Sequence, residues 1–270
     1  MVAVAEPDTV PDTIEATVNY HPGEANLSSP DALGGRAQDS RRVVLRNGRL
    51  DASGFALDRS GFRFVRHDSA VVDFFDDEEV RHTYHPEIEA LVKAESGASR
   101  VVVFEHKVRT TDAALREARK LRGVVRGVHN DFTESSGPKC LRAHLPQEAD
   151  ELLRRRFAIV QVWQPMHHPV ETLPLGICDA RSISAKDLVV SKRRVGESYS
   201  ITYNPDHLWY WFPRMRCDEA LIFKVYESLD DGRARWTPHA AFEDPTSPPG
   251  APPRQSIQTR TFAFFEDAAQ

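Results

Sequence analysis

The sequence predicts a mainly β fold with flanking helices, in the form of an antiparallel sandwich or jelly roll. A series of short runs rich in β-branched and aromatic residues fills the second half of the chain, and turn residues separate them. The chain has 270 residues, which is enough for a substantial core, and all-β folds of this size are often a single domain. We therefore expect one domain over residues 41–270.

An N-terminal extension is expected over residues 1–40. This segment is rich in Pro, Asp, Glu, Ser and Gly, with one apolar interruption at residues 14–20. Such a composition buries little apolar surface, so the sequence predicts a flexible segment or an arm along the domain.

The first half of the domain should combine strands with helices. An early β-hairpin is expected from residues 43–45, the turn residues Asn47-Gly48 and the alternating run 55–65. Apolar residues at helical spacing over residues 76–94 predict a helical segment, in which Pro86 begins a second helix. The β-branched run at residues 100–106 predicts a buried strand.

The next elements lead into the second half. Thr111-Asp112 offers an N-cap for a short helix over residues 111–121, and residues 135–156 read as two helices broken near Pro146. Short strands are then expected at residues 157–163, 173–178, 188–190, 199–203, 208–212, 220–226 and 257–265. This order is typical of a sandwich or jelly roll and not of a βαβ enzyme.

Composition favours a small-molecule partner. The net charge is -5 and the basic residues are scattered, which argues against nucleic acid. Cys140, Cys178 and Cys217 are widely spaced without a CxxC pair, as in proteins of reducing compartments. No apolar run is long enough to span a bilayer and no signal peptide is evident. We therefore expect a cytoplasmic protein without a membrane partner; the oligomeric state is not predicted.

A possible metal site lies at residues 128–133. His129 and Asp131 are separated by one residue, so on an extended strand both side chains point to the same face. In a jelly roll His239, more than a hundred residues later, can reach the same face. Two histidines and one carboxylate leave coordination positions open, which suits non-haem Fe(II) that activates O2. The alternative for each residue alone is a chance spacing or a hydrogen-bonded structural histidine.

A pair that could bind 2-oxoglutarate comes after the second histidine. Arg254 and Ser256 share a face of a strand, and a guanidinium with a hydroxyl provides oriented, charge-assisted hydrogen bonds to a carboxylate. The alternative is that Arg254 forms an ion pair with a nearby acid such as Asp244. After the HxD pair and the distal histidine, we favour the carboxylate clamp.

A series of motifs in order resembles a known family over about residues 100–262. The motifs are Gln161-Val162-Trp163-Gln164-Pro165, Pro174-Leu175, Cys178-Asp179, His207-Leu208-Trp209-Tyr210-Trp211-Phe212-Pro213, Asp218-Glu219, Phe223-Lys224-Val225-Tyr226-Glu227-Ser228, His239, Phe242, Asp244-Pro245 and Pro253-Arg254-Gln255-Ser256-Ile257. They are similar to those of the fungal and bacterial hydroxylase/desaturase family, which includes gibberellin desaturase-like proteins and relatives of the cephamycin methoxylase component.

The resemblance implies a double-stranded β-helix, which is a cupin-like jelly roll, and an Fe(II)- and 2-oxoglutarate-dependent oxygenase. It implies the iron ligands His129, Asp131 and His239 and a 2-oxoglutarate clamp of Arg254 with Ser256. This chain has Gln161 and Gln164 where many relatives have Asn and Arg, and Gln255 where many have Glu. We interpret the two glutamines as a change in the pocket, which leaves the substrate unassigned.

Three further residues are candidates for substrate contacts: Gln161, Trp163 and Arg260. Arg260 alternates with Ser256 and could meet a substrate carboxylate inside the barrel, although a salt-bridged arginine fits the pattern equally well. Trp163 and its neighbours in the strand are otherwise core aromatics. His207 is interpreted as a hydrogen-bonded structural histidine.

The predicted enzyme is a non-haem dioxygenase that uses Fe(II), 2-oxoglutarate and O2 and releases succinate and CO2. It oxidises a C–H bond of a small specialised metabolite, with hydroxylation, desaturation or ring closure as open outcomes. The first alternative is a zinc hydrolase or isomerase on a cupin-like barrel that uses the same three ligands. The second is a non-catalytic β-sandwich in which the HxD pair is accidental.

Overall fold

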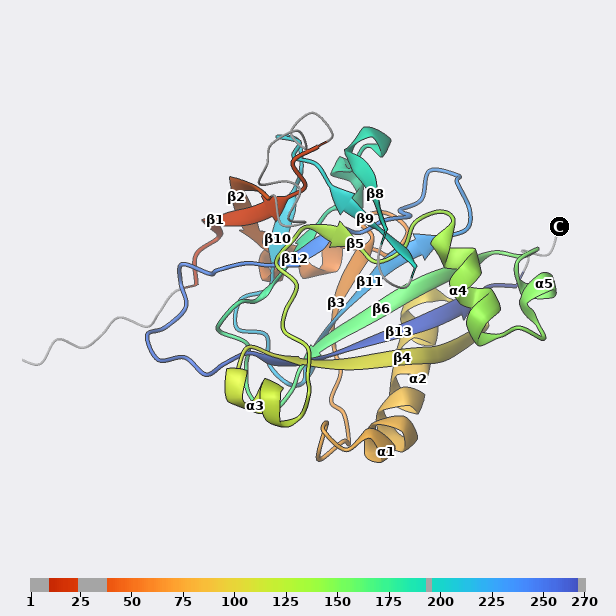
Figure 1. Cartoon of the computed structure of the whole chain (residues 1–270), viewed down its shortest axis with the longest axis horizontal. Helices are drawn as coiled ribbons and strands as arrows, with labels where there is room; N and C mark the ends of the chain where they lie inside the picture. Colours follow the sequence, from red (N-terminus) through yellow and green to blue (C-terminus); the bar gives the residue numbers. More distant parts are fainter. Residues whose placement is uncertain (1–9, 24–37, 193–195, 267–270) are drawn as a thin grey trace, which may run out of the picture.

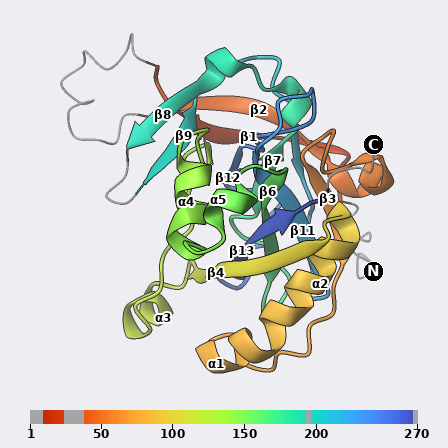
Figure 2. The ribbon, with the colours of Figure 1, turned by 90° about the vertical axis from the view of Figure 1, so that its right-hand side faces the viewer.

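Two facing β-sheets form the body of the molecule in the computed structural model, which describes residues 10–23, 38–192 and 196–266. Figure 1 shows the long strands of one sheet crossing the centre, and Figure 2 shows the second sheet above it. The smaller sheet has the order β3-β11-β6-β13-β4 and the larger has the order β1-β2-β10-β7-β12-β5-β9-β8. This arrangement confirms the predicted jelly roll.

The five-stranded sheet consists of antiparallel neighbours. Its strands are β3 (Phe62–Arg66), β4 (Arg100–Thr110), β6 (Phe157–Pro165), β11 (Glu219–Glu227) and β13 (Gln255–Phe264). Every residue of β6 and β11 is buried. Apolar residues therefore run continuously along these two strands, because both faces of the sheet are covered.

The eight-stranded sheet is built from shorter strands. They are β1 (Thr13–Tyr20), β2 (Asp39–Asn47), β5 (His129–Asn130), β7 (Leu175–Cys178), β8 (Leu188–Lys192), β9 (Glu197–Ile201), β10 (Trp209–Trp211) and β12 (His239–Ala241). Alternate residues of β1 are buried, and the strand pairs with β2 at the edge of the sheet. Residues 13–20, which belong to the expected N-terminal extension, are thus part of the sheet. Residues 1–9 and 24–37 of that extension lie outside the described residues.

The expected early hairpin is wrong. β2 pairs with β1 and β10 in the larger sheet, whereas β3 pairs with β11 in the smaller one. Asn47 does not turn the chain back, because its side chain accepts a hydrogen bond from the Arg49 N–H and caps a 3-10 helix at Gly48–Gly54. The segment therefore carries the chain from one sheet to the other.

Helices cover the outer face and one end of the five-stranded sheet, as Figure 2 shows for α1 and α2. The elements are α1 (Asp77–Glu79), a π-helical segment (Val80–Tyr84), α2 (His85–Ser96), α3 (Ala113–Ala118), α4 (Ser136–His144), α5 (Ala149–Leu152) and short 3-10 turns at Ala180–Ser182 and Ala185–Asp187. α2 has Pro86 in its first turn, as predicted, and packs Ile88 and Val92 against the outer face of β6 and β13. No helix in the described ranges is long and apolar enough to cross a membrane.

A buried polar network ties the edge strand β1 to the larger sheet. The Tyr20 hydroxyl accepts a hydrogen bond from the Trp209 indole N–H at 2.7 Å and contacts His207 Nδ1 at 3.1 Å. His207 Nε2 in turn contacts a carboxylate oxygen of Asp187 at 3.2 Å. His207 is therefore a hydrogen-bonded structural histidine, as its sequence context indicated.

Helix α4 is held close to β11 by a glycine. A Cβ added at Gly137 would lie 2.4 Å from the Tyr226 ring, so the helix can approach the strand only without a side chain at this position. This contact fixes the distance between α4 and the barrel.

We predict that Gly137→Ala lowers the free energy of unfolding by roughly 1–3 kcal/mol, because the new methyl group overpacks the Tyr226 ring. The expected sign is informative, since alanine in a helix would otherwise be stabilising by about 1 kcal/mol. Urea unfolding of both proteins measures the difference. Gly123→Ala is the control, because its Cβ would meet only the flexible Arg116 guanidinium; equal effects of the two substitutions would contradict the prediction.

Candidate active site

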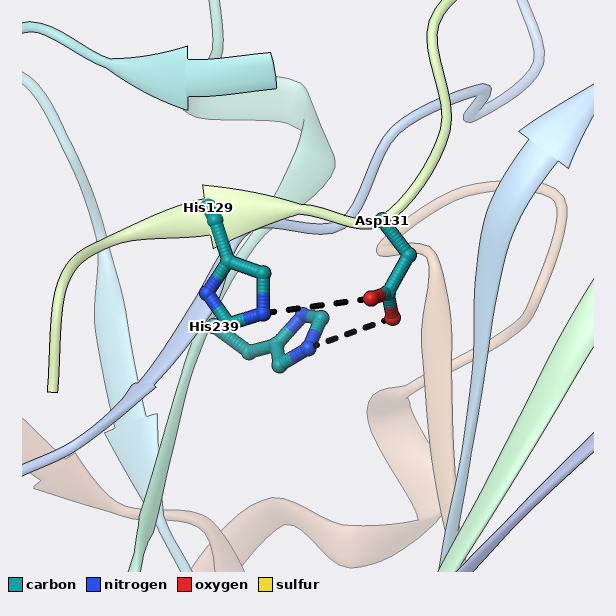
Figure 3. A group of neighbouring side chains, drawn as sticks. All are labelled: His129, Asp131 and His239. Carbon is teal, nitrogen blue, oxygen red and sulfur yellow. Dashed lines mark ion pairs between the residues drawn. The ribbon is translucent and has the colours of Figure 1, made fainter. Parts of the chain in front are cut away.

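The structure brings His129, Asp131 and His239 together inside the barrel, as Figure 3 shows. One ligand atom from each residue lies within 4.8 Å of the others. His129 is in β5 and His239 is in β12, and the two residues are direct partners in the antiparallel ladder. Asp131 lies just beyond the two-residue strand β5. The pairing of short strands thus joins residues that are more than a hundred positions apart.

Both histidines present the same ring nitrogen to the carboxylate. His129 Nδ1 lies 2.9 Å from the Gly127 carbonyl, and His239 Nδ1 lies 3.0 Å from the Thr237 carbonyl. Since a carbonyl only accepts hydrogen bonds, each Nδ1 carries the proton and each Nε2 keeps its lone pair. The Nε2 atoms lie 3.9 Å and 3.6 Å from the oxygens of Asp131. This is the tautomer that a metal-ligating imidazole needs.

Asn130, between the two candidate ligands, anchors the segment from the opposite face. Its amide donates hydrogen bonds to the carbonyls of Phe132 and Val225 at 2.8 and 2.9 Å, and its oxygen accepts one from the Thr237 N–H at 3.1 Å. The carbonyl of Thr237 is the group that orients His239. Asn130 therefore couples the two ligand segments, a role that only its alternation with His129 and Asp131 could have suggested.

Arg260 holds the remaining side of Asp131. Its Nη2 donates to Asp131 Oδ1, and its Nη1 donates to Glu105 Oε2. Burial opposes ionisation of Asp131, but the charge of Arg260 keeps its pKa well below the usual range. Asp131 is thus a carboxylate in the folded protein.

The donor set fits a divalent metal. Asp131 Oδ2 is buried and has no hydrogen-bond partner among the described residues, although it faces the imidazole of His239. A buried carboxylate oxygen without a partner is costly, and a cation bound there would satisfy it. Two imidazoles and one carboxylate form the facial set typical of non-haem Fe(II).

Arg254 and Ser256 also lie together. Arg254 Nε donates to Ser256 Oγ at 3.2 Å, and Nη1 donates to the Leu173 carbonyl at 2.7 Å. The guanidinium lies over the Trp163 ring, 4.8 Å from its centroid. Arg254 is buried, yet no carboxylate of the described residues is within ion-pair distance, so the Asp244 pairing considered from the sequence does not form.

The environment of Arg254 favours an anion. Burial lowers the pKa of Arg254 to about 9, and the nearby charge of Arg109 adds to the effect. The indole Nε1 of Trp163 is also buried without a hydrogen-bond partner in the described part of the chain. Two guanidinium groups and an unpaired donor in a buried region are the features of a carboxylate site.

A cavity of about 700 Å³ opens beside Asp131 and Arg260. Its walls come from β4, the segment after β5, α4 and β13, and they include the rings of Phe104 and Phe132. Gln161 and Trp163, the other two candidates for substrate contacts, are not among its described lining residues. Gln161 instead accepts hydrogen bonds from Gln258 and Arg260 at 2.8 and 3.0 Å.

Gln164 faces away from the site, which corrects the interpretation that it reshapes the pocket. It accepts a hydrogen bond from the Tyr84 hydroxyl at 2.7 Å and donates to the carbonyls of His67 and Cys217. Since alternate residues of β6 point to opposite faces, Gln161 lies inside the barrel and Gln164 lies on the helix-covered side. The second glutamine stabilises the helical layer.

Comparison with known proteins agrees with this geometry. A family model described as an oxidoreductase/YMDC permease-like domain matches residues 9–264. The alpha-ketoglutarate-dependent dioxygenase phiK from Fungal sp. is 30% identical over 93% of this chain and 96% of its own length. The hydroxylase/desaturase CTB9 from Cercospora beticola is 33% identical, over 86% of this chain and 79% of its own. The chain belongs to the hydroxylase/desaturase family of Fe(II)- and 2-oxoglutarate-dependent oxygenases.

The solved structures support the same family. The iron and alpha-ketoglutarate-dependent endoperoxidase NvfI superposes with a TM-score of 0.82 and 26% identity over 96% of this chain and all of its own. The resemblance drawn from the sequence motifs is therefore confirmed. The zinc hydrolase and the non-catalytic sandwich are not favoured.

We predict that the metal-free protein loses stability with acidity through His239. Burial, reinforced by His129, lowers the pKa of His239 from 6.5 to about 3, so between these values the unfolded chain binds a proton that the folded protein does not. Between about pH 7 and pH 5 the wild type should lose roughly 1–2 kcal/mol more than His239→Gln. Urea unfolding at both pH values gives the two losses, and losses of equal size would contradict the prediction.

Proposed function

We propose that His129, Asp131 and His239 hold Fe(II) in this oxygenase and that Arg254 with Ser256 binds the distal carboxylate of 2-oxoglutarate. The observation that carries the proposal is the geometry of the triad: two proton-bearing Nδ1 atoms are fixed by carbonyls, and both Nε2 atoms face the unpartnered Oδ2 region of one carboxylate. Bound Fe(II) supplies the activation of O2, with 2-oxoglutarate converted to succinate and CO2.

The strand β13 connects the two parts of the proposed site. Arg254 precedes the strand and Ser256 is its second residue, and alternation along the strand puts Gln258 and Arg260 on the same face. The row therefore runs from the proposed carboxylate clamp to the residue that contacts Asp131. A five-carbon diacid that lies along this row could reach both the clamp and the metal.

The cavity beside Asp131 is the proposed substrate site. Its volume of about 700 Å³ suits a small organic molecule, and its aromatic walls exclude water from the reacting carbon. The enzyme oxidises a C–H bond of a small specialised metabolite. Hydroxylation, desaturation and ring closure differ in the second bond that forms at the substrate, so the orientation that the cavity imposes decides among them.

We expect Asp131→Ala to abolish the substrate-independent conversion of 2-oxoglutarate to succinate, because the two histidines alone leave the metal without its charged ligand. Succinate is quantified in the presence of Fe(II) and ascorbate. The matched control is Asp231→Ala, which removes an exposed carboxylate paired with Arg233. Turnover by Asp131→Ala at the level of the control would refute the ligand assignment.

Replacement of Arg254 should act on the cosubstrate. Arg254→Ala is expected to raise the apparent KM for 2-oxoglutarate roughly 10- to 100-fold, since a buried carboxylate loses its charged hydrogen-bond partner. The same succinate assay, with varied 2-oxoglutarate, measures this change. Arg142→Ala, which removes an exposed arginine paired with Asp150, should leave KM unchanged. A KM for Arg254→Ala equal to that of the control would place the clamp elsewhere.

A further inference from the structure

Arg260 uses each part of its guanidinium for a different side chain. Nη2 donates to Asp131 Oδ1, Nη1 donates to Glu105 Oε2, and Nε donates to Gln161 Oε1 at 3.0 Å. The side chain is only 13% exposed. Glu105 in β4 and Gln161 in β6 are the two cross-strand partners of Arg260 in β13, so the guanidinium is fixed from both neighbouring strands.

The supporting residues are themselves held. Glu105 Oε1 binds Lys107 Nζ at 2.5 Å, and Gln161 Oε1 also accepts a hydrogen bond from Gln258 at 2.8 Å. The planar guanidinium is a rigid fork, and three separate acceptors define its position and orientation. Its contact with Asp131 is therefore directed and is not a flexible surface ion pair.

This contact makes the two oxygens of Asp131 different. Oδ1 accepts the hydrogen bond from Arg260, whereas Oδ2 is buried, has no hydrogen-bond partner among the described residues and lies 3.6 Å from His239 Nε2. A carboxylate that is bound through one oxygen leaves one oxygen for a metal. A freely rotating carboxylate could offer both oxygens and occupy an additional coordination position.

We propose that Arg260 is the positioning residue of the metal centre: it engages Asp131 Oδ1 so that the carboxylate binds the metal through Oδ2 alone. The inference rests on the proposed function of the triad. Arg260 was a candidate for substrate contact on the sequence alone, and its contacts here assign it to the metal ligand. Because Arg254 and Arg260 flank the same row on β13, one strand places both the proposed clamp and the proposed metal ligand.

Titration of the metal-free protein with Co(II), a spectroscopic substitute for Fe(II), tests the proposal without turnover. Arg260→Gln should lower the Co(II) affinity about 10- to 100-fold, as is typical when an outer partner of a metal ligand is removed. It should also change the visible Co(II) absorption, which reports the number of ligands. Arg260→Lys keeps the charge but loses the fork, so it should recover only part of the affinity.

Two further variants keep the test decisive. Glu105→Gln removes a carboxylate that positions Arg260 and should weaken Co(II) binding in the same direction, and this variant carries the test if Arg260→Gln does not fold. Arg100→Gln is the control, because it removes an arginine of β4 that pairs with the exposed Glu148. Its affinity and spectrum should match the wild type.

The possible failures are distinguishable. Wild-type affinity and an unchanged spectrum in Arg260→Gln, together with lost binding in Asp131→Ala, would overturn the role of Arg260 and leave the triad intact. Tighter binding in Arg260→Gln would also overturn it, since the arginine would then act only as a repelling charge. Unchanged Co(II) binding in Asp131→Ala would instead refute the metal site itself.

Discussion

A single buried carboxylate connects the two sheets of this barrel. Asp131 lies just after a strand of the eight-stranded sheet, faces the two histidines of that sheet and accepts a hydrogen bond from Arg260 of the five-stranded sheet. Its charge is stabilised by the arginine, and its second oxygen is left for the triad. The positions of the histidines, the cavity and the strand β13 all meet at this residue.

Two buried arginines on one strand differ in their anionic partners. Near the start of β13 the buried Arg254 has no carboxylate within ion-pair distance among the described residues, whereas further along Arg260 contacts two carboxylates. Burial of a cation without an anionic partner is unfavourable, so the region of Arg254 is complete only with an anionic ligand. The region of Arg260 is complete within the protein. This asymmetry separates a binding residue from a positioning residue of the same type.

Much of the architecture could be predicted from local sequence signals. The strands from β6 onward and the helices α2, α3 and α4 occur where β-branched runs, Pro86 and Asp112 indicated, because these signals act over a few residues. The three members of the triad could be proposed because histidine and aspartate at HxD spacing have few other joint uses. The hairpin failed because alternation identifies a strand and its faces but not its sheet. The positions of Asn130, Gln164 and Arg260 required the structure, since hydrogen-bond partners in other strands decide their roles.

The central claim is that one metal ion is held between the two histidine Nε2 atoms and Asp131 Oδ2, with 2-oxoglutarate extending to Arg254. An anaerobic crystal structure with Fe(II) and 2-oxoglutarate, with anomalous data collected at the iron absorption edge, tests it most directly. We expect one anomalous peak bonded to these three atoms and a ligand carboxylate on the Arg254 guanidinium. A peak elsewhere, or a peak at the triad with the cosubstrate carboxylate away from Arg254, would contradict the claim.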